Sequence, residues 1–146
     1  MATRVFLVDD HPIVRQALRR LLEQNGLDVV GEARDAAEGL RLAGELCPDV
    51  VVLDVARPVA RCLSAAREII RSVPLKGMIL VAFEDYLVAE AFRAGIRGYV
   101  LKDRVAEDLP MAIQEVAGRG IYLSPGLPSA VVELHPTAAN GGSPTL

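Results

Sequence analysis

The chain has 146 residues, of which 51% are hydrophobic and 24% are charged, and its net charge at pH 7 is −3. This length suits one compact domain with a sizeable core, and the balance of apolar and charged residues excludes a disordered chain. The negative net charge argues against binding of nucleic acid by this chain itself.

Targeting and redox signals are absent from the sequence. The first apolar run stops at Asp9, which is too early for a signal peptide, and no run approaches the roughly 18 apolar residues that would cross a bilayer. Cys47 and Cys62 lie apart without paired or metal-binding spacing, which indicates a reducing compartment. We therefore expect a cytoplasmic protein with no membrane partner.

Short β-branched runs alternate with longer stretches of helical period along the chain. Pro12 suits the first turn of the first helix, Gly26 ends that helix, and Asp35 is placed to cap the second. This α/β pattern predicts a five-stranded parallel sheet with helices on both faces. The predicted strands cover residues 4–8, 28–32, 50–53, 78–82 and 98–101, and the predicted helices cover 11–24, 36–46, 61–72, 85–94 and 105–117.

Charged side chains follow three of the predicted strands. Asp9 and Asp10 close the first apolar run, Asp54 closes another, and Lys102 follows the last. Ligands of parallel sheets bind beyond the carboxyl ends of the strands, so these side chains should meet at one site. Carboxylates forced together bind a hard divalent cation, because the cation removes their repulsion. An interaction of Asp9 and Asp10 with the dipole of the next helix is the alternative.

The composition changes after Tyr122. Residues 124–128 read Ser-Pro-Gly-Leu-Pro, and residues 136–146 are small, polar and punctuated by Gly and Pro. Such a segment is typical of a linker. We therefore expect a folded domain over residues 1–120 and a partly disordered C-terminal linker over residues 121–146, which suggests that the chain is one piece of a longer protein.

Three stretches in this order resemble a known family. They are residues 8–12 (Val-Asp-Asp-His-Pro), residues 95–103 (Gly-Ile-Arg-Gly-Tyr-Val-Leu-Lys-Asp) and residues 122–125 (Tyr-Leu-Ser-Pro). Over about residues 3–120 the chain resembles the receiver domain of bacterial two-component response regulators of the NarL/LuxR-type class. The resemblance implies a (βα)5 flavodoxin-like receiver fold. It also implies a phosphoprotein that is not an enzyme, with a sensor histidine kinase as partner, a homodimer as a further expectation, and transcriptional output through a helix-turn-helix DNA-binding domain outside this sequence.

The resemblance assigns a role to each charged residue. Asp54 would be the phosphoacceptor, a carboxylate nucleophile that forms an acyl phosphate. Mg²⁺ would be held by Asp10 directly, by Asp9 largely through water, and by Asp54 and the backbone carbonyl of Ala56. Lys102 would pair with Asp54 and then with the phosphoryl oxygens, so that the metal and the ammonium neutralise the charge that spreads during phosphoryl transfer.

The predicted switch departs from the family pattern. The family places Ser or Thr at the end of the fourth strand, and counting from Asp54 reaches Ala82, with no Ser or Thr between Val73 and Gly120. Alanine cannot donate the hydrogen bond that draws this loop toward a phosphoryl group, and such bonds to charged groups are worth about 1.5–3 kcal/mol. Tyr99 matches the aromatic switch position, whose ring moves inward on activation; a half-buried packing residue is the alternative.

The loop after the predicted acceptor also departs. Family members commonly read Asp-x-x-Met-Pro-Gly, then Asp or Asn and Gly, whereas residues 54–62 read Asp-Val-Ala-Arg-Pro-Val-Ala-Arg-Cys. Pro58 is kept, Arg57 replaces Met, and both glycines are missing, so this loop should have a different shape. One hypothesis is that the guanidinium of Arg57 competes with Mg²⁺ for the carboxylates.

Three functions remain open at this point. A receiver switched by phosphorylation of Asp54 is the leading interpretation. An atypical receiver that signals through protein contacts without phosphorylation is the alternative, for which Ala82 and Arg57 argue. A small Mg²⁺ phosphatase is disfavoured, because such enzymes usually carry a second acid two residues after the nucleophile and a substrate cap, and position 56 is alanine.

Overall fold

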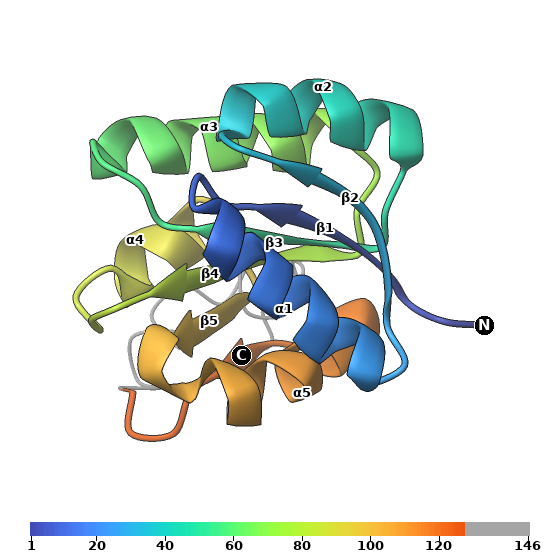
Figure 1. Ribbon diagram of the computed structural model, residues 1–146. Coiled ribbons are helices and arrows are strands. Elements are labelled where there is room, and N and C mark those ends of the chain that lie inside the picture. The colour runs from blue at the N-terminus through green and yellow to red at the C-terminus, as the bar shows by residue number, and fades with distance from the viewer. Residues whose placement is uncertain (128–146) are drawn as a thin grey trace.

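Six parallel strands in the order β2-β1-β3-β4-β5-β6 form the centre of the computed structural model, which describes residues 1–127 (Figure 1). The strands are β1 (Arg4–Val8), β2 (Asp28–Ala33), β3 (Val50–Asp54), β4 (Gly77–Ala82), β5 (Gly98–Leu101) and β6 (Tyr122–Leu123). The helices are α1 (Pro12–Gln24), α2 (Ala36–Leu46), α3 (Val59–Ser72), α4 (Val88–Arg93) and α5 (Val105–Ala117), with a single 3₁₀ turn, η1 (Lys102–Arg104), before α5.

The alternation of side chains along each strand divides the core in two. Phe6, Val51 and Leu80 pack with α2, α3 and α4 on one face, whereas Leu7 and Val52 pack with α1 and α5 on the other. Figure 1 shows α2 and α3 over one face and α1 and α5 over the opposite face. Strands that are buried on both sides explain the continuous apolar runs of the sequence.

The predicted parallel α/β sheet is confirmed, and the structure adds one strand to the five that were expected. Within the segment predicted to be linker, Tyr122 pairs with Gly98 and Leu123 with Tyr99. The amide of Ser124 also donates to the carbonyl of Tyr99 at 3.0 Å, so residues 122–124 cover the edge of β5 that β4 leaves free. A strand of two residues is too short for periodicity to reveal. The remaining residues of the predicted linker, 128–146, lie outside the described part of the chain.

Helix α4 begins three residues later than the sequence predicts, at Val88 rather than Asp85. Residues 83–87 form turns instead, and they carry the carbonyl of Glu84 to the hydroxyl of Tyr99, which donates to it. A long-range hydrogen bond therefore overrides the local helical pattern.

Within residues 1–127, no helix has both the length and the apolar character needed to cross a membrane.

The point where strand order reverses lies at β1. This strand pairs with β2 on one side and with β3 on the other, so that α1 and α2 leave toward opposite faces of the sheet. The carboxyl ends of β1 and β3 are adjacent, because Val8 lies opposite Leu53. The residues that follow these ends, Asp9 and Asp54, are thereby placed where ligands of open α/β sheets bind.

Candidate functional site

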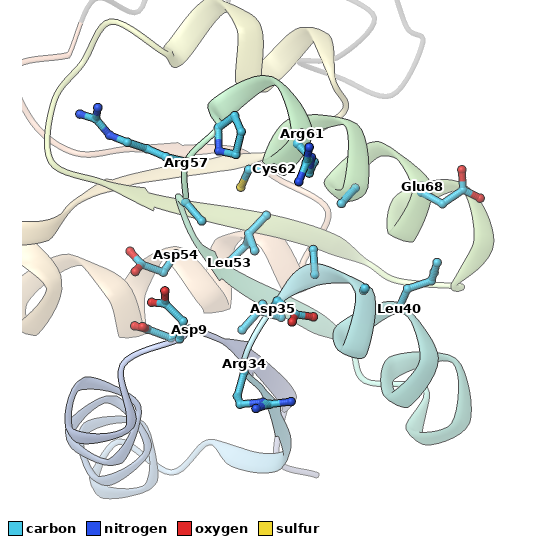
Figure 2. Close-up of a pocket in the computed structure, with 17 residues that line it drawn as sticks. Asp9, Arg34, Asp35, Leu40, Leu53, Asp54, Arg57, Arg61, Cys62 and Glu68 are labelled. Carbon is cyan, nitrogen blue, oxygen red and sulfur yellow. The ribbon is translucent and has the colours of Figure 1, made fainter.

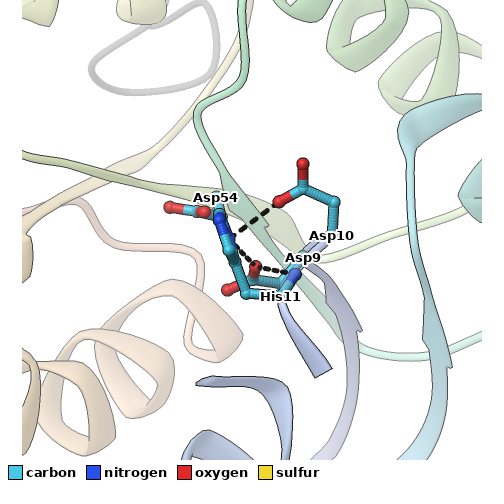
Figure 3. A group of neighbouring side chains, drawn as sticks. All are labelled: Asp9, Asp10, His11 and Asp54. Carbon is cyan, nitrogen blue, oxygen red and sulfur yellow. Dashed lines mark hydrogen bonds and ion pairs between the residues drawn. The ribbon is translucent and has the colours of Figure 1, made fainter. Parts of the chain in front are cut away.

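Four side chains gather beyond the ends of β1 and β3 (Figure 3). Each of Asp9, Asp10, His11 and Asp54 offers a ligand atom, and these atoms all lie within 4.8 Å of one another. Asp9 and Asp54 are buried, at 3% and 8% exposed, whereas Asp10 and His11 face solvent. The three carboxylates therefore lie together, as their positions at the ends of the strands predict.

Lys102 completes the group from the end of β5. Its Nζ lies 2.6 Å from Oδ1 of Asp54, and the side chains are 21% and 7% exposed. Burial raises the pKa of Asp54 and the charge of Asp9 adds to this effect, while Lys102 opposes both by stabilising the carboxylate. The ammonium thus supplies the main compensation for a carboxylate that the fold has largely removed from water.

The chemistry of the cluster fits a divalent cation. Oδ2 of Asp9 is buried and accepts no hydrogen bond from any of the described residues. A buried carboxylate oxygen without a donor is costly unless a cation compensates it. Asp10 and Asp54 bring further carboxylate oxygens to the same point, and Mg²⁺ and Ca²⁺ prefer oxygen ligands. Ala56, the predicted carbonyl ligand, lines the same cavity as these residues.

His11 contacts Asp9 and Asp10, which the sequence did not reveal. It was predicted to start α1, and it is the N-cap residue of that helix. Its Nδ1 also lies 2.8 Å from Oδ1 of Asp10 and 3.2 Å from Oδ1 of Asp9. Its backbone amide donates to the same Asp9 oxygen at 2.9 Å, so His11 helps to orient both acids (Figure 3).

Arg15 also makes contacts that the sequence did not reveal, because its helical spacing indicated only a solvated helix face. Its Nη1 donates to the carbonyl of Asp9 at 2.7 Å, and its Nε pairs with Glu32 on β2 at 2.9 Å. Glu32 is also paired with Arg19, one turn further along α1. These bonds fix the loop between β1 and α1, which presents Asp9 and Asp10.

The predicted loop residues Arg57 and Pro58 line a cavity of about 560 Å³ that opens beside the carboxylates (Figure 2). Arg57 is exposed, and Figure 2 shows its side chain extending away from Asp9 and Asp54. Within residues 1–127, Arg57 has no ion pair with these carboxylates, so no contact supports the hypothesis of competition with a cation; it stays a prediction.

Ala82 and Tyr99, the predicted switch residues, lie on neighbouring strands. Ala82 ends β4, is 1% exposed and pairs with Leu101. The ring of Tyr99 is fully buried, and its hydroxyl donates to the carbonyl of Glu84 in the loop after β4. Burial raises the pKa of Tyr99 to about 12. The phenol is therefore a neutral donor that holds this loop against β5.

Comparison with known sequences identifies a family. The model of the response regulator receiver domain matches residues 5–114. The transcriptional regulatory protein LnrK of Bacillus subtilis (strain 168) is 37% identical over 127 residues, which cover 85% of this chain and 58% of LnrK. The DNA-binding transcriptional activator DevR/DosR of Mycobacterium tuberculosis is 40% identical over 122 residues, covering 81% of this chain and 56% of that protein. The chain thus spans less than two thirds of these relatives.

Solved structures agree with this match. A two-component response regulator of the LuxR family from Aurantimonas sp. SI85-9A1 has a TM-score of 0.79 and 34% identity, covering 92% of this chain and 99% of that one. The signal receiver domain of the putative response regulator NarL from Mycobacterium tuberculosis has a TM-score of 0.69 and 32% identity, covering 80% and 97%. The sequence, the sheet order and the acidic site agree: the chain belongs to the response regulator receiver domain family.

Proposed function

We propose that Asp54 accepts a phosphoryl group from a sensor histidine kinase in the cytoplasm and that this modification controls a transcriptional output domain. The observation that carries the proposal is the placement of Asp54, between the ammonium of Lys102 at 2.6 Å and the acidic cluster of Asp9 and Asp10. These are the groups that phosphoryl transfer needs, because positioning and charge neutralisation dominate its catalysis.

In the proposed transfer, a carboxylate oxygen of Asp54 attacks the phosphorus of the phosphohistidine. The new O–P bond forms as the P–N bond breaks, and the nitrogen of the kinase histidine leaves with the electron pair. Lys102, which neutralises the carboxylate beforehand, then pairs with the phosphoryl oxygens. The Lys102 side chain is 21% exposed, so its ammonium can reach both the carboxylate of Asp54 and a phosphoryl group that arrives from solvent.

Mg²⁺ is the proposed cofactor, held by Asp9, Asp10, Asp54 and the carbonyl of Ala56. When bound, it supplies positive charge beside the transferred group. The buried Oδ2 of Asp9, which accepts no hydrogen bond within residues 1–127, supports this assignment. His11 and Arg15 hold Asp9 and Asp10 in place through the contacts described above.

The proposed output is transcription, through a helix-turn-helix domain that is not part of this sequence. The names of LnrK and DevR/DosR, which describe transcriptional regulators, support this, as does the share of their length that the chain leaves unmatched. A homodimer formed or rearranged on phosphorylation is the expected intermediate between the site and DNA.

An atypical receiver that signals through protein contacts is the second candidate. Two observations favour it: Ala82 has no hydroxyl to follow a phosphoryl group, and the ring of Tyr99 is already buried, with its hydroxyl bonded to the loop after β4. In that case the inward state of Tyr99 does not depend on the charge of Asp54.

Intact-mass spectrometry after incubation with acetyl phosphate and Mg²⁺ tests the proposal. The wild type should gain the mass of one phosphoryl group, and neither Asp54→Asn nor wild type with chelator should gain it. A folded wild type that gains no mass, with no spectral change on beryllium fluoride, would instead support the atypical receiver.

A further inference from the structure

The loop between β4 and α4, residues 83–87, has one contact with the candidate site and one with the sheet. The ring of Phe83 lies under the ammonium of Lys102, with Nζ 4.4 Å from the ring centroid. The next residue, Glu84, accepts the hydroxyl hydrogen bond of Tyr99. A displacement of Lys102 can therefore reach this loop directly, and through it Tyr99 on β5.

Lys102 thus lies between two partners. Oδ1 of Asp54 is 2.6 Å from its Nζ, and the face of Phe83 is the other neighbour. The attraction between an ammonium and an aromatic face depends on where the charge lies over the ring. If the ammonium moves toward a new negative group at Asp54, its position over the ring changes. The cation–π attraction then changes as well and favours a matching movement of the ring.

Phe83 is not explained by packing. It is 74% exposed and belongs to neither half of the core among the described residues, although it follows the buried end of β4. The preceding residue, Ala82, has a methyl side chain, which cannot donate a hydrogen bond to the site. The observed contact of the Phe83 side chain is with Lys102, a charged member of the site.

We propose that Phe83 is a positioning residue for Lys102 and that its contact with the ammonium couples the charge at Asp54 to the loop, in place of a hydroxyl at position 82. The proposal rests on the proposed function of Asp54. It predicts that the aromatic ring, and not merely the apolar bulk, is required.

Substitutions separate these two properties. Phe83→Leu keeps the bulk but removes the aromatic face, and Phe83→Tyr keeps the face. Tyr86→Leu is the matched control, because Tyr86 lies in the same loop and is 63% exposed. Since both side chains are largely in solvent, these variants should fold, which circular dichroism verifies.

The first measurement is the NMR spectrum of the Lys102 side chain without any phosphoryl analogue. The ε-methylene protons should show an upfield ring-current shift in the wild type, Phe83→Tyr and Tyr86→Leu, and lose it in Phe83→Leu. A shift that persists in Phe83→Leu would overturn the contact whatever happens at Asp54.

The second measurement is titration with beryllium fluoride, a phosphoryl analogue, in the presence of Mg²⁺. Phe83→Leu should change the affinity for the analogue by up to about two- to fivefold, because an exposed cation–π contact is worth that factor and the contact differs between the free and the bound state. The amide resonances of residues 84–87 should respond in the wild type and Phe83→Tyr, and respond far less in saturated Phe83→Leu.

The outcomes distinguish the inference from the function on which it rests. If the wild type binds the analogue and Phe83→Leu binds it equally well with the same loop response, the role of Phe83 is refuted and that of Asp54 stands. If the wild type does not bind the analogue, both fail together.

Discussion

Lys102 and Asp54 form a 2.6 Å ion pair in which the two partners differ in exposure. Asp54 ends a buried strand, whereas Lys102 follows β5 and keeps about a fifth of its side-chain surface in solvent. Burial raises the pKa of Asp54, and the nearby ammonium of Lys102 opposes this by stabilising the carboxylate. This asymmetry makes the pair testable by double substitution.

Lys102→Ala should destabilise the protein because it leaves Asp54 charged and largely buried. We expect the free energy of unfolding at neutral pH to fall by about 1–3 kcal/mol. The same substitution in an Asp54→Asn background should cost clearly less, since the buried charge is gone. Urea denaturation of the four proteins gives the coupling energy. Equal costs in the two backgrounds would show that the ion pair contributes nothing.

Mg²⁺ should stabilise the protein through the acidic cluster. A ligand that binds only the folded state at a hundred times its Kd adds about 2.7 kcal/mol. Asp9→Asn should lose most of this stabilisation, because Asp9 supplies the buried oxygen that accepts no hydrogen bond within the described chain. Asp103→Asn is the control, an exposed acid beside Lys102 that is not in the cluster. Thermal melts with and without Mg²⁺ check this; equal stabilisation of Asp9→Asn and the control would place the metal elsewhere.

Tyr99→Phe should loosen the loop of residues 83–87. The variant keeps the buried ring but removes the donor to the carbonyl of Glu84, at a cost of about 0.5–1.5 kcal/mol. Amide exchange at residues 85–87 should accelerate. Ultraviolet titration gives an independent check, because a tyrosine with a pKa of about 12 should be present in the wild type and missing from the variant. Unchanged exchange would mean that this hydrogen bond does not hold the loop.

Asp108 should make stability depend on acid pH. It is 1% exposed, and although burial raises its pKa, hydrogen bonds from Arg104 and Ser124 outweigh this effect, so that its pKa is lowered overall. A lowered carboxyl pKa contributes stability above the ordinary pKa of about 3.9, and this is lost as pH falls through the folded value.

The measurement compares Asp108→Asn with the wild type by urea denaturation at several pH values. The variant should be about 2 kcal/mol less stable at neutral pH, and the difference should shrink as acid protonates Asp108 in the wild type. The same variant should loosen residues 124–127, because the hydroxyl of Ser124, which donates to Asp108, also accepts from the amide of Leu101 at 3.0 Å. A difference that does not change with pH would contradict the charged role of Asp108.

The strands and the carboxylate cluster could be predicted from the sequence because their signals are local. Apolar runs and turn residues define the strands, Asp35 caps α2 as expected by accepting from the amide of Glu38, and a parallel sheet brings Asp9 and Asp54 together once the topology is known.

The contacts that could not be predicted join residues whose local patterns mean something else. Arg15 lies on a helix face like any solvated arginine, and only the fold brings it to Glu32 and the carbonyl of Asp9. Phe83 reads as an ordinary apolar residue after a strand. Ser124 looks like part of a turn, yet it is buried against Asp108. Such pairings depend on tertiary structure, which spacing along the chain does not encode.

Chemical trapping of the phosphorylated residue tests the central claim most directly. The protein is incubated with acetyl phosphate and Mg²⁺, the acyl phosphate is reduced with borohydride, and the peptides are sequenced by mass spectrometry. Our account predicts reduction of the aspartate at position 54 alone, in a reaction that requires Mg²⁺ and is lost in Asp54→Asn. Labelling at Asp9 or Asp10, or no reduced aspartate in a folded protein, would contradict it.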